Sequence, residues 1–289
     1  MKSSTKPETR QRPRRSGSDM PFLVTLSVIA GTYVLLIVML IVADITYLGV
    51  AGSKTAESGI AGWPIIGAMV SAFRSPEIRN AIELTMISCT ITAILSVFVA
   101  VPVGYLLARY RFPGRNLIDA ILDIPIILPP LVVGLSLLIL FQFLPEHVRR
   151  NVVYEKPAVV LAQFMVACAF AVRTMRATFD QIDERREQVA LTLGCSKKQA
   201  FMMVILPEAW PGVLTAGTLA WARALGEFGP LLIFAGATRN KTEVLSTTVF
   251  LELSIGDLSA AVTVSLIMVM AAIAVVITAR TWGSRSINL

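Results

Sequence analysis

The 289-residue sequence has few charged side chains: Asp, Glu, Lys and Arg make up 16% of it, whereas hydrophobic residues make up 55%. A soluble domain of this length carries roughly 25% charged residues. The charges are also grouped between long apolar runs, and the mean hydropathy is +0.71. This scarcity of charge argues against an ordinary soluble domain and predicts a polytopic membrane protein.

Residues that hold metals or carry out catalysis are scarce as well. The three cysteines, Cys89, Cys168 and Cys195, are far apart, and His147 is the only histidine. Their spacing fits neither a disulfide framework nor a metal site. Segment 52–55 (GSKT) lacks the glycine that a phosphate-binding loop places five residues before its Gly-Lys pair. We therefore expect no catalytic residues, no metal and no bound cofactor, and the chain is not expected to be an enzyme.

Six stretches are apolar and long enough, or nearly long enough, to cross a bilayer, which takes about 20 helical residues. They are residues 20–43, 82–108, 118–143, 158–172, 209–235 and 258–279. The fourth is short and is expected to extend back to Pro157 or forward past Arg173. The predicted fold class is all-α, with six transmembrane helices.

Lysine and arginine are distributed unequally between the connections. Seventeen lie in the two terminal tails and in the second-to-third and fourth-to-fifth connections, whereas eight lie in the other connections. Because cytoplasmic connections carry the excess of these residues, both termini are expected in the cytoplasm. The net charge of +7 is thereby attributed to membrane topology rather than to nucleic-acid binding.

Composition divides the chain into three parts. Residues 1–19 are polar and rich in Ser, Pro and Arg, which predicts a disordered basic cytoplasmic tail. Residues 20–80 contain the first span and a periplasmic loop, whose apolar stretch 60–73 predicts a short helix along the membrane surface. Residues 81–283 form the core, with a long cytoplasmic loop at 179–207.

This cytoplasmic loop has a distinctive local pattern. Its first half, EQVALTLG from Glu187 to Gly194, contains good helix formers, and acidic residues near its start suit a helix N-terminus. Gly194 stands where a helix needs a residue able to take positive φ. Ser196 and Gln199 form a capping-box pattern that begins a second helix, and Pro207 is expected to end that helix. The loop therefore predicts a helix, a glycine turn and a second helix at the membrane face.

The same loop resembles the EAA loop of binding-protein-dependent ABC importer permeases. That pattern is Glu-Ala-Ala, three residues, Gly, nine residues, Ile, one residue and Leu-Pro. Four positions of this chain match it: Ala190, Gly194, Leu206 and Pro207. Three depart from it, Gln188, Val189 and Val204, and Glu187 supplies an acidic group one position early. A generic amphipathic interfacial helix is the alternative for any single element, but the combined pattern favours the resemblance.

The resemblance implies that the first short helix docks in a groove of a separate cytoplasmic ATPase, which binds the ATP. The residues implied in this coupling are Glu187, Gln188, Ala190, Leu193, Gly194, Leu206 and Pro207. It also implies a type I (MetI-like) permease fold in a bacterial inner membrane, working as a dimer with a second copy or a homologous permease. An extracytoplasmic solute-binding protein would dock on outside loops, including residues 239–257.

The resemblance covers most of residues 80–280 and extends to the cargo. Residues 221–236 and 242–261 resemble the molybdate, tungstate and sulfate permeases more than those for sugars or peptides. The sequence Leu128-Pro129-Pro130 favours molybdate or tungstate. The additional N-terminal span keeps sulfate or thiosulfate open, and another small solute is a further alternative.

Two features inside the spans are candidates for the translocation pathway. Pro129 and Pro130 lie within the third span, and their freed carbonyls need neighbouring helices or water, so this span is expected to pack centrally. Arg223 and Glu227 are four residues apart and are expected to share a helix face. A structural ion pair and a role in the substrate path both remain open for them.

Two other classes of protein compete with the ABC permease. A secondary transporter needs no ATPase and more often shows several buried acidic residues for ion coupling. Here the candidates are Glu227, Asp119 and Asp123, the last two near the inner surface. A membrane scaffold protein would not need the proline-rich third span.

Overall fold

The computed structural model describes residues 20–54, 70 and 73–285, and every regular element in these ranges is helical. The predicted disordered tail at 1–19 and most of the predicted surface helix, at 60–69, lie outside the described residues. The chain forms two units, Met1–Tyr47 and Leu48–Leu289. The described part of the first unit is helix α1 (Met20–Lys54), which also runs on beyond it and contains an apolar stretch, Phe22–Val50, long enough to span a membrane.

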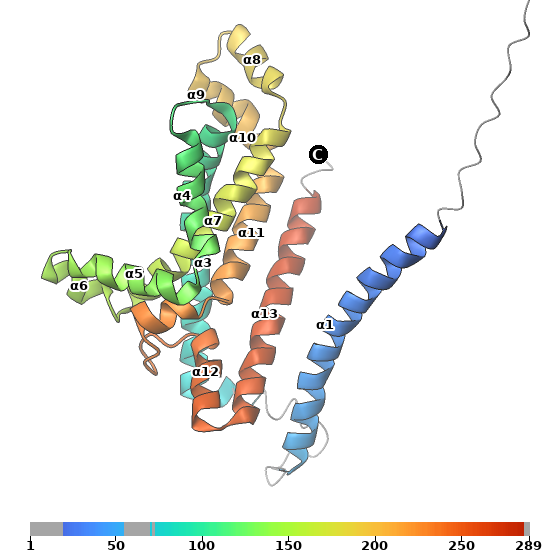
Figure 1. The fold of residues 1–289 in the computed structure, drawn as a ribbon, viewed down its shortest axis with the longest axis vertical. Helices are drawn as coiled ribbons and strands as arrows, with labels where there is room; N and C mark the ends of the chain where they lie inside the picture. The colour runs from blue at the N-terminus through green and yellow to red at the C-terminus, as the bar shows by residue number, and fades with distance from the viewer. Residues whose placement is uncertain (1–19, 55–69, 71–72, 286–289) are drawn as a thin grey trace, which may run out of the picture. The chain divides into compact units, whose positions relative to one another are not determined.

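The second unit is a bundle of long helices (Figure 1). Its long helices are α3 (Pro76–Arg109), α7 (Lys156–Gln181), α11 (Trp210–Leu225) and α13 (Leu258–Arg285). α3, α7 and α11 pack along one another, and α13 packs against α11 and α12 (Leu245–Ile255). The bundle therefore has a core of three mutually packed helices with α13 on one side.

Small residues allow the three central helices to approach closely. Fully buried alanines line their contacts, among them Ala100, Ala171 and Ala216. At Gly104 of α3, a Cβ atom would lie 2.8 Å from the Cβ of Met175 of α7, closer than real carbon atoms approach. Small residues at helix interfaces are typical of membrane proteins, in which packing replaces the hydrophobic driving force between helices.

The shorter elements lie at the ends of the bundle and along its side, where α5 and α6 extend away from the long helices (Figure 1). They are α4 (Arg115–Ile127), α5 (Pro130–Gln142), α6 (Glu146–Val152), α8 (Glu184–Thr192), α9 (Lys197–Ala200), η1 (Phe201–Ile205), α10 (Leu206–Glu208) and η2 (Leu231–Ala235). Figure 1 shows α8 and α9 at one end of the bundle and α12 at the other. We refer to these as the α8 end and the α12 end.

Four of the predicted spans are confirmed as long apolar helices: α1, α3, α7 and α13. α7 extends beyond the predicted stretch 158–172 in both directions. It can begin before Pro157 because a backbone N–H in the first turn of a helix needs no partner within the helix, so a proline is tolerated there. The other two predicted spans are broken. The described residues also contain two bent helix pairs, Arg115–Ile127 with Pro130–Gln142 and Lys197–Glu208 with Trp210–Leu225. With each pair counted as one span, these residues hold up to six crossings.

The third span was expected as one helix over 118–143, and this is wrong. α4 ends at Ile127, and α5 begins at Pro130 after a bend of 112°. A residue before proline favours an extended backbone, and Leu128 and Pro129 both precede a proline. Their ψ angles of 143° and 133° show this extended conformation.

The fifth span was expected as one helix over 209–235, and this is also wrong. α11 ends at Leu225, and the segment 226–229 separates it from Pro230 and η2. The glycine-rich sequence GEFG explains the break, since glycine weakens a helix interior by about 1 kcal/mol per residue.

The two breaks contact each other. A Cβ atom at Gly134 of α5 would lie 2.7 Å from the Cα of Pro230, and one at Gly229 would lie 2.9 Å from the Cβ of Pro130. Glycine is therefore required at both positions by close approach. The irregular backbone of each break is therefore packed against the other break, as irregular backbone at membrane depth is found buried in protein.

Candidate functional site

Helix α8 is defined at both ends by the chemistry that the sequence predicted. At its start, the Arg185 backbone N–H donates to the Asp183 carboxylate at 2.9 Å. At its end, Gly194 has φ +92°, and the N–H of Cys195 donates to the Ala190 carbonyl at 3.1 Å. The Gly194 N–H donates to Leu191 at 3.0 Å, which completes a Schellman cap.

The second helix of the loop begins as predicted but continues further. Ser196 and Gln199 form the reciprocal capping box at its start. Pro207 does not end it: the helix runs on to Glu208 and bends by 69° into α11. η1, which lies between α9 and α10, is one wide turn in which the Leu206 N–H donates to the carbonyl of Phe201, five residues back. The wide turn leaves room for the proline ring, as single wide turns do within α-helices.

The inner face of α8 lies against the C-terminal end of α3. The Tyr105 hydroxyl donates to the Glu187 carboxylate at 2.6 Å. Arg109, whose side chain is 7% exposed, donates to the Ile182 carbonyl at 2.7 Å and lies 3.7 and 3.8 Å from the carboxylates of Glu184 and Glu187. Glu187 therefore faces the bundle.

An aromatic cluster surrounds this contact. The Tyr105 ring centroid lies 5.5 Å from that of Phe179 in α7 and 4.6 Å from that of Phe201 in η1. Both distances are typical of interacting aromatic pairs. One side chain of α3 therefore contacts α7, α8 and η1.

The outer face of α8 is apolar and exposed. Leu193 is 80% exposed and Val189 59%, and Met203 of η1, 71% exposed, lies beside them. These three side chains line a groove of about 590 Å³, together with Arg185, Arg186 and Glu208. We call this groove, between α8 and the helix that follows it, the α8 groove. Apolar side chains this exposed at the end of a bundle mark an interaction surface.

The coupling residues predicted from the sequence fall into two sets. Gln188, Leu193, Gly194 and Pro207 are exposed, and Leu206 is half-buried. Ala190 is buried within the chain, so its small size serves internal packing, and Glu187 also faces inward. Sequence reasoning missed Tyr105, Arg109 and Met203. Only the position of Arg109 at the end of an apolar span signalled a role.

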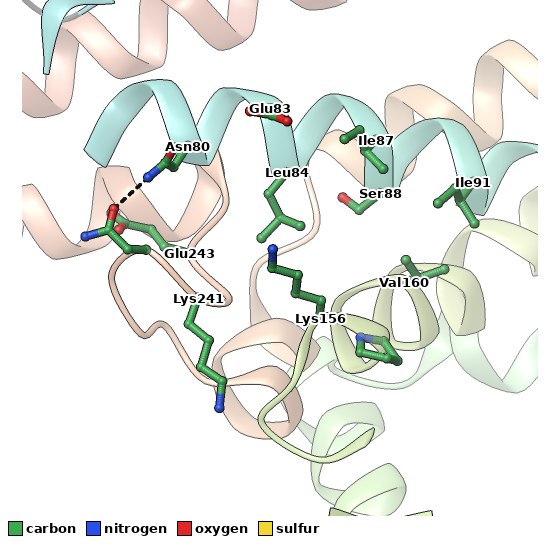
Figure 2. Close-up of a pocket in the computed structure, with 12 residues that line it drawn as sticks. Asn80, Glu83, Leu84, Ile87, Ser88, Ile91, Lys156, Val160, Lys241 and Glu243 are labelled. Atoms are coloured by element: carbon green, nitrogen blue, oxygen red, sulfur yellow. Dashed lines mark hydrogen bonds between the residues drawn. The ribbon is translucent and has the colours of Figure 1, made fainter. Parts of the chain in front are cut away.

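The α12 end contains a second candidate site, a cavity of about 480 Å³ shown in Figure 2. It lies between the first turns of α3, the start of α7 and the segment 236–244. Lys156 and Lys241 line it together with Glu83 and Glu243. Two ammonium groups and two carboxylates balance, so the charge of the cavity by itself does not select an anion.

Three consecutive residues fasten the segment 236–244 to other elements. Arg239 pairs with Glu77 of α3 and, at 2.8 Å, with Glu252 of α12. Asn240 accepts a hydrogen bond from Asn80 of α3 at 2.9 Å, drawn in Figure 2. Lys241 pairs with Glu155, directly before α7. These contacts hold the α12 ends of α3, α7 and α12 together.

Glu243 lies beneath these contacts and is 3% exposed. Neither of its carboxylate oxygens has a hydrogen-bond partner within the described residues. Burial raises the pKa of this carboxyl above its ordinary value, and the nearby Thr248 hydroxyl and Arg239 only partly oppose the shift.

The charges expected inside the spans are paired. Glu227, 1% exposed, lies 2.8 Å from Arg223, although α11 ends between them and they do not share one continuous helix. Asp119 and Asp123 of α4 pair with Arg176 and Arg173 of α7, respectively. In the described ranges, no three His, Cys, Asp or Glu side chains come together in a way that could hold a metal ion.

Comparison with known proteins gives a consistent result. Residues 100–284 match the family described as binding-protein-dependent transport system inner membrane component. The chain is 32% identical over 218 residues to the sulfate transport system permease protein CysT of Salmonella typhimurium, which covers 73% of this chain and 78% of that protein. It is 35% identical over 167 residues to the molybdate/tungstate transport system permease protein WtpB of Thermococcus kodakarensis, covering 58% and 65%.

Solved structures show the same fold at low sequence identity. A chain of a bacterial alginate ABC transporter, solved with an alginate-bound periplasmic protein, matches with a TM-score of 0.66 and 15% identity over 93% of this chain and 98% of that one. A chain of the MetNI methionine ABC transporter in an inward-facing conformation matches with a TM-score of 0.61 and 17% identity, over 78% and 99%.

Proposed function

Because the chain belongs to the family of binding-protein-dependent transport system inner membrane components, we propose that it forms the translocation pathway of an ATP-driven importer of a tetrahedral oxyanion. ATP is hydrolysed by a separate ATPase. The α8 end faces the cytoplasm, where the excess of lysine and arginine was counted, and the α12 end faces the solute-binding protein.

The exposed apolar α8 groove is the observation that carries this proposal. Leu193, Val189 and Met203 would be costly to leave in water, at about 25 cal/mol for each Å² of apolar surface. A groove or helix on the ATPase that covers them would bind by helix-in-groove packing. Arg185 and Arg186 at the groove edge would add contacts with acidic groups of the partner.

The three carboxylates that the sequence offered for ion coupling in a secondary transporter are all paired. Asp119, Asp123 and Glu227 each have an arginine partner, so they are not free carboxylates available for ion coupling. The chain is also similar to permeases of sulfate and of molybdate or tungstate, and these relatives support an oxyanion as cargo. The sulfate permease match covers more of both chains, so sulfate stands beside molybdate and tungstate as a candidate cargo.

A single pair of variants tests the docking surface. Leu193→Glu places a charge on a side chain that is 80% exposed, so the fold is expected to persist while the ATPase is lost in a mild-detergent pull-down. Leu258→Glu, at a 45% exposed leucine of the α12 end, is the matched control and should retain the ATPase. Recovery of no ATPase with the wild-type chain would refute the function. In reconstituted complexes, sulfate, molybdate and tungstate are then compared for uptake.

A further inference from the structure

Helix α8 has little packing of its own, since Ala190 is the only buried residue among its nine. Directed contacts must therefore fix its orientation. One of them, the ion pair of Arg186 with Glu208 at 2.6 Å, involves an arginine side chain that is 61% exposed. Exposed ion pairs contribute little to stability. α8 also packs against η1 and α9, and the directed contacts with the least exposed partners are those made by α3.

These contacts hold α8 at two points. Tyr105 holds Glu187 in the first turns of α8, and Arg109 holds the carbonyl of Ile182 in the two-residue connection from α7. Hydrogen bonds to a charged group are about twice as strong as those between neutral groups. A buried arginine that loses its partners strongly destabilises the folded protein. These directed contacts therefore hold α8 against α3 more firmly than the packing of α8 alone would.

Helix α3 is also fastened at its other end. Glu77 pairs with Arg239, and Asn80 donates to Asn240. The backbone N–H of Leu245, at the start of α12, donates to the Thr85 hydroxyl at 2.9 Å. α3 is one helix of 34 residues, about 50 Å long, and it stays helical through Pro102 although that residue has no N–H to donate. It is therefore a single element with directed contacts to α8 at one end and to 236–244 and α12 at the other.

We propose that α3 transmits the displacement of α8 to the segment 236–244, and that Tyr105 and Arg109 are the positioning residues that attach α8 to it. The inference rests on the proposed function, in which α8 carries the ATPase. Its specific content is that Glu187 acts inside the chain as the attachment point of α8. When α8 moves, α3 moves with it and displaces the residues bound to Glu77 and Asn80.

The test compares Tyr105→Phe, Glu187→Gln and the double variant in reconstituted complexes with the ATPase that co-purifies with the wild-type chain and with the solute-binding protein. Tyr105→Phe keeps the ring and its aromatic contacts and removes the hydroxyl. Tyr110→Phe is the matched control, because its ring also contacts Tyr105 and its hydroxyl has no hydrogen bond within the described residues. Radioactive sulfate and molybdate are the probes, and uptake is divided by ATP hydrolysed.

Each single variant is expected to lower uptake per ATP about tenfold, the effect of losing one hydrogen bond to a charged group. The double variant should lose less than the two single effects added together, because both variants weaken the Tyr105–Glu187 contact, and only Glu187→Gln also removes the charge beside Arg109. The ATPase should still co-purify with all of them. Tyr110→Phe should keep the wild-type ratio.

A labelling measurement follows the motion itself. A cysteine replaces the exposed Thr238 in a chain that also carries Cys195→Ser, and its rate of reaction with a thiol reagent is compared with and without trapped nucleotide. Trapped nucleotide should change the labelling rate in the chain that carries only these two substitutions. It should leave the rate unchanged when Tyr105→Phe is added.

The outcomes separate the two hypotheses. If the wild-type chain recovers no ATPase, the proposed function fails, and this inference fails with it. If the ATPase is recovered but Tyr105→Phe and Glu187→Gln keep the wild-type uptake per ATP, or if their effects add, this inference alone is overturned. If Tyr105→Phe does not fold, Glu187→Gln decides, with the label at residue 238 as the second measurement.

Discussion

Replacing Gly194 by alanine should weaken ATPase binding although the new methyl group touches nothing. No atom from another part of the chain lies within 4 Å of a Cβ built at this glycine, so a clash with packed neighbours is excluded. The cause is the backbone: φ is +92°, and an L-residue with a side chain is less stable there by about 1–2 kcal/mol. The Schellman cap that ends α8 requires this conformation.

The size of the effect follows from how little else holds the cap. A helix of nine residues is marginal alone, so the full 1–2 kcal/mol shifts the equilibrium between formed and opened cap, a factor of about 5–30. The ATPase binds the formed state, so its apparent affinity falls by up to the same factor. Gly194→Asn should lose less, because asparagine tolerates the left-handed region better.

Gly256 provides a matched control. It ends α12 with φ +90°, no atom lies within 4 Å of its Cβ position, and it is at the opposite end of the bundle. Titration of the purified ATPase onto each immobilised variant gives the affinities, and thermal unfolding in detergent gives the stabilities. Gly194→Ala should reduce affinity while Gly256→Ala does not. Equal losses of affinity, or none with Gly194→Ala, would refute the reasoning.

Two further predictions concern buried charge. Burial raises the pKa of Glu243, so the folded state disfavours the ionised carboxylate, and stability should fall as pH rises from 4.5. Glu243→Gln should therefore raise the melting temperature at pH 8 and lose this advantage near pH 4. A difference in melting temperature that does not depend on pH would contradict the account. Arg223→Met leaves Glu227 buried and unpaired, at a cost of about 3–5 kcal/mol, whereas Glu227→Gln leaves an arginine that is 28% exposed and should cost less. Thermal unfolding of both variants checks this order, and the reverse order would contradict the argument from the burial of Glu227.

Sequence reasoning succeeded where local chemistry decides the structure. The caps at Gly194 and Ser196 depend on neighbouring residues, and both form as predicted. The acidic start of α8 was also expected, and there Asp183 caps the helix. The long apolar helices follow from composition for the same reason. The match to the EAA pattern likewise lay within one short segment.

It failed where partners far apart in the sequence decide. The prolines at 129 and 130 were expected inside one continuous span, but the chain bends there by 112°, and Gly229 and Pro230 pack against the bend. The inward orientation of Glu187 depends on Tyr105, 82 residues earlier. A helical period shows which side chains share a face, but it does not show which face meets the partner.

The paired breaks at Leu128–Pro129 and at 226–229 constrain how the chain is made. α4 and α5 have 13 residues each, about 20 Å of helix, and α11 has 16, about 24 Å, whereas the hydrocarbon core is about 30 Å thick. Neither half of a broken span can be delivered to the bilayer as a finished crossing. We expect α4 and α5 to stay at the insertion machinery until the segment around Gly229 emerges from the ribosome, some 100 residues later. Maturation of the first half of the core therefore depends on synthesis of the second.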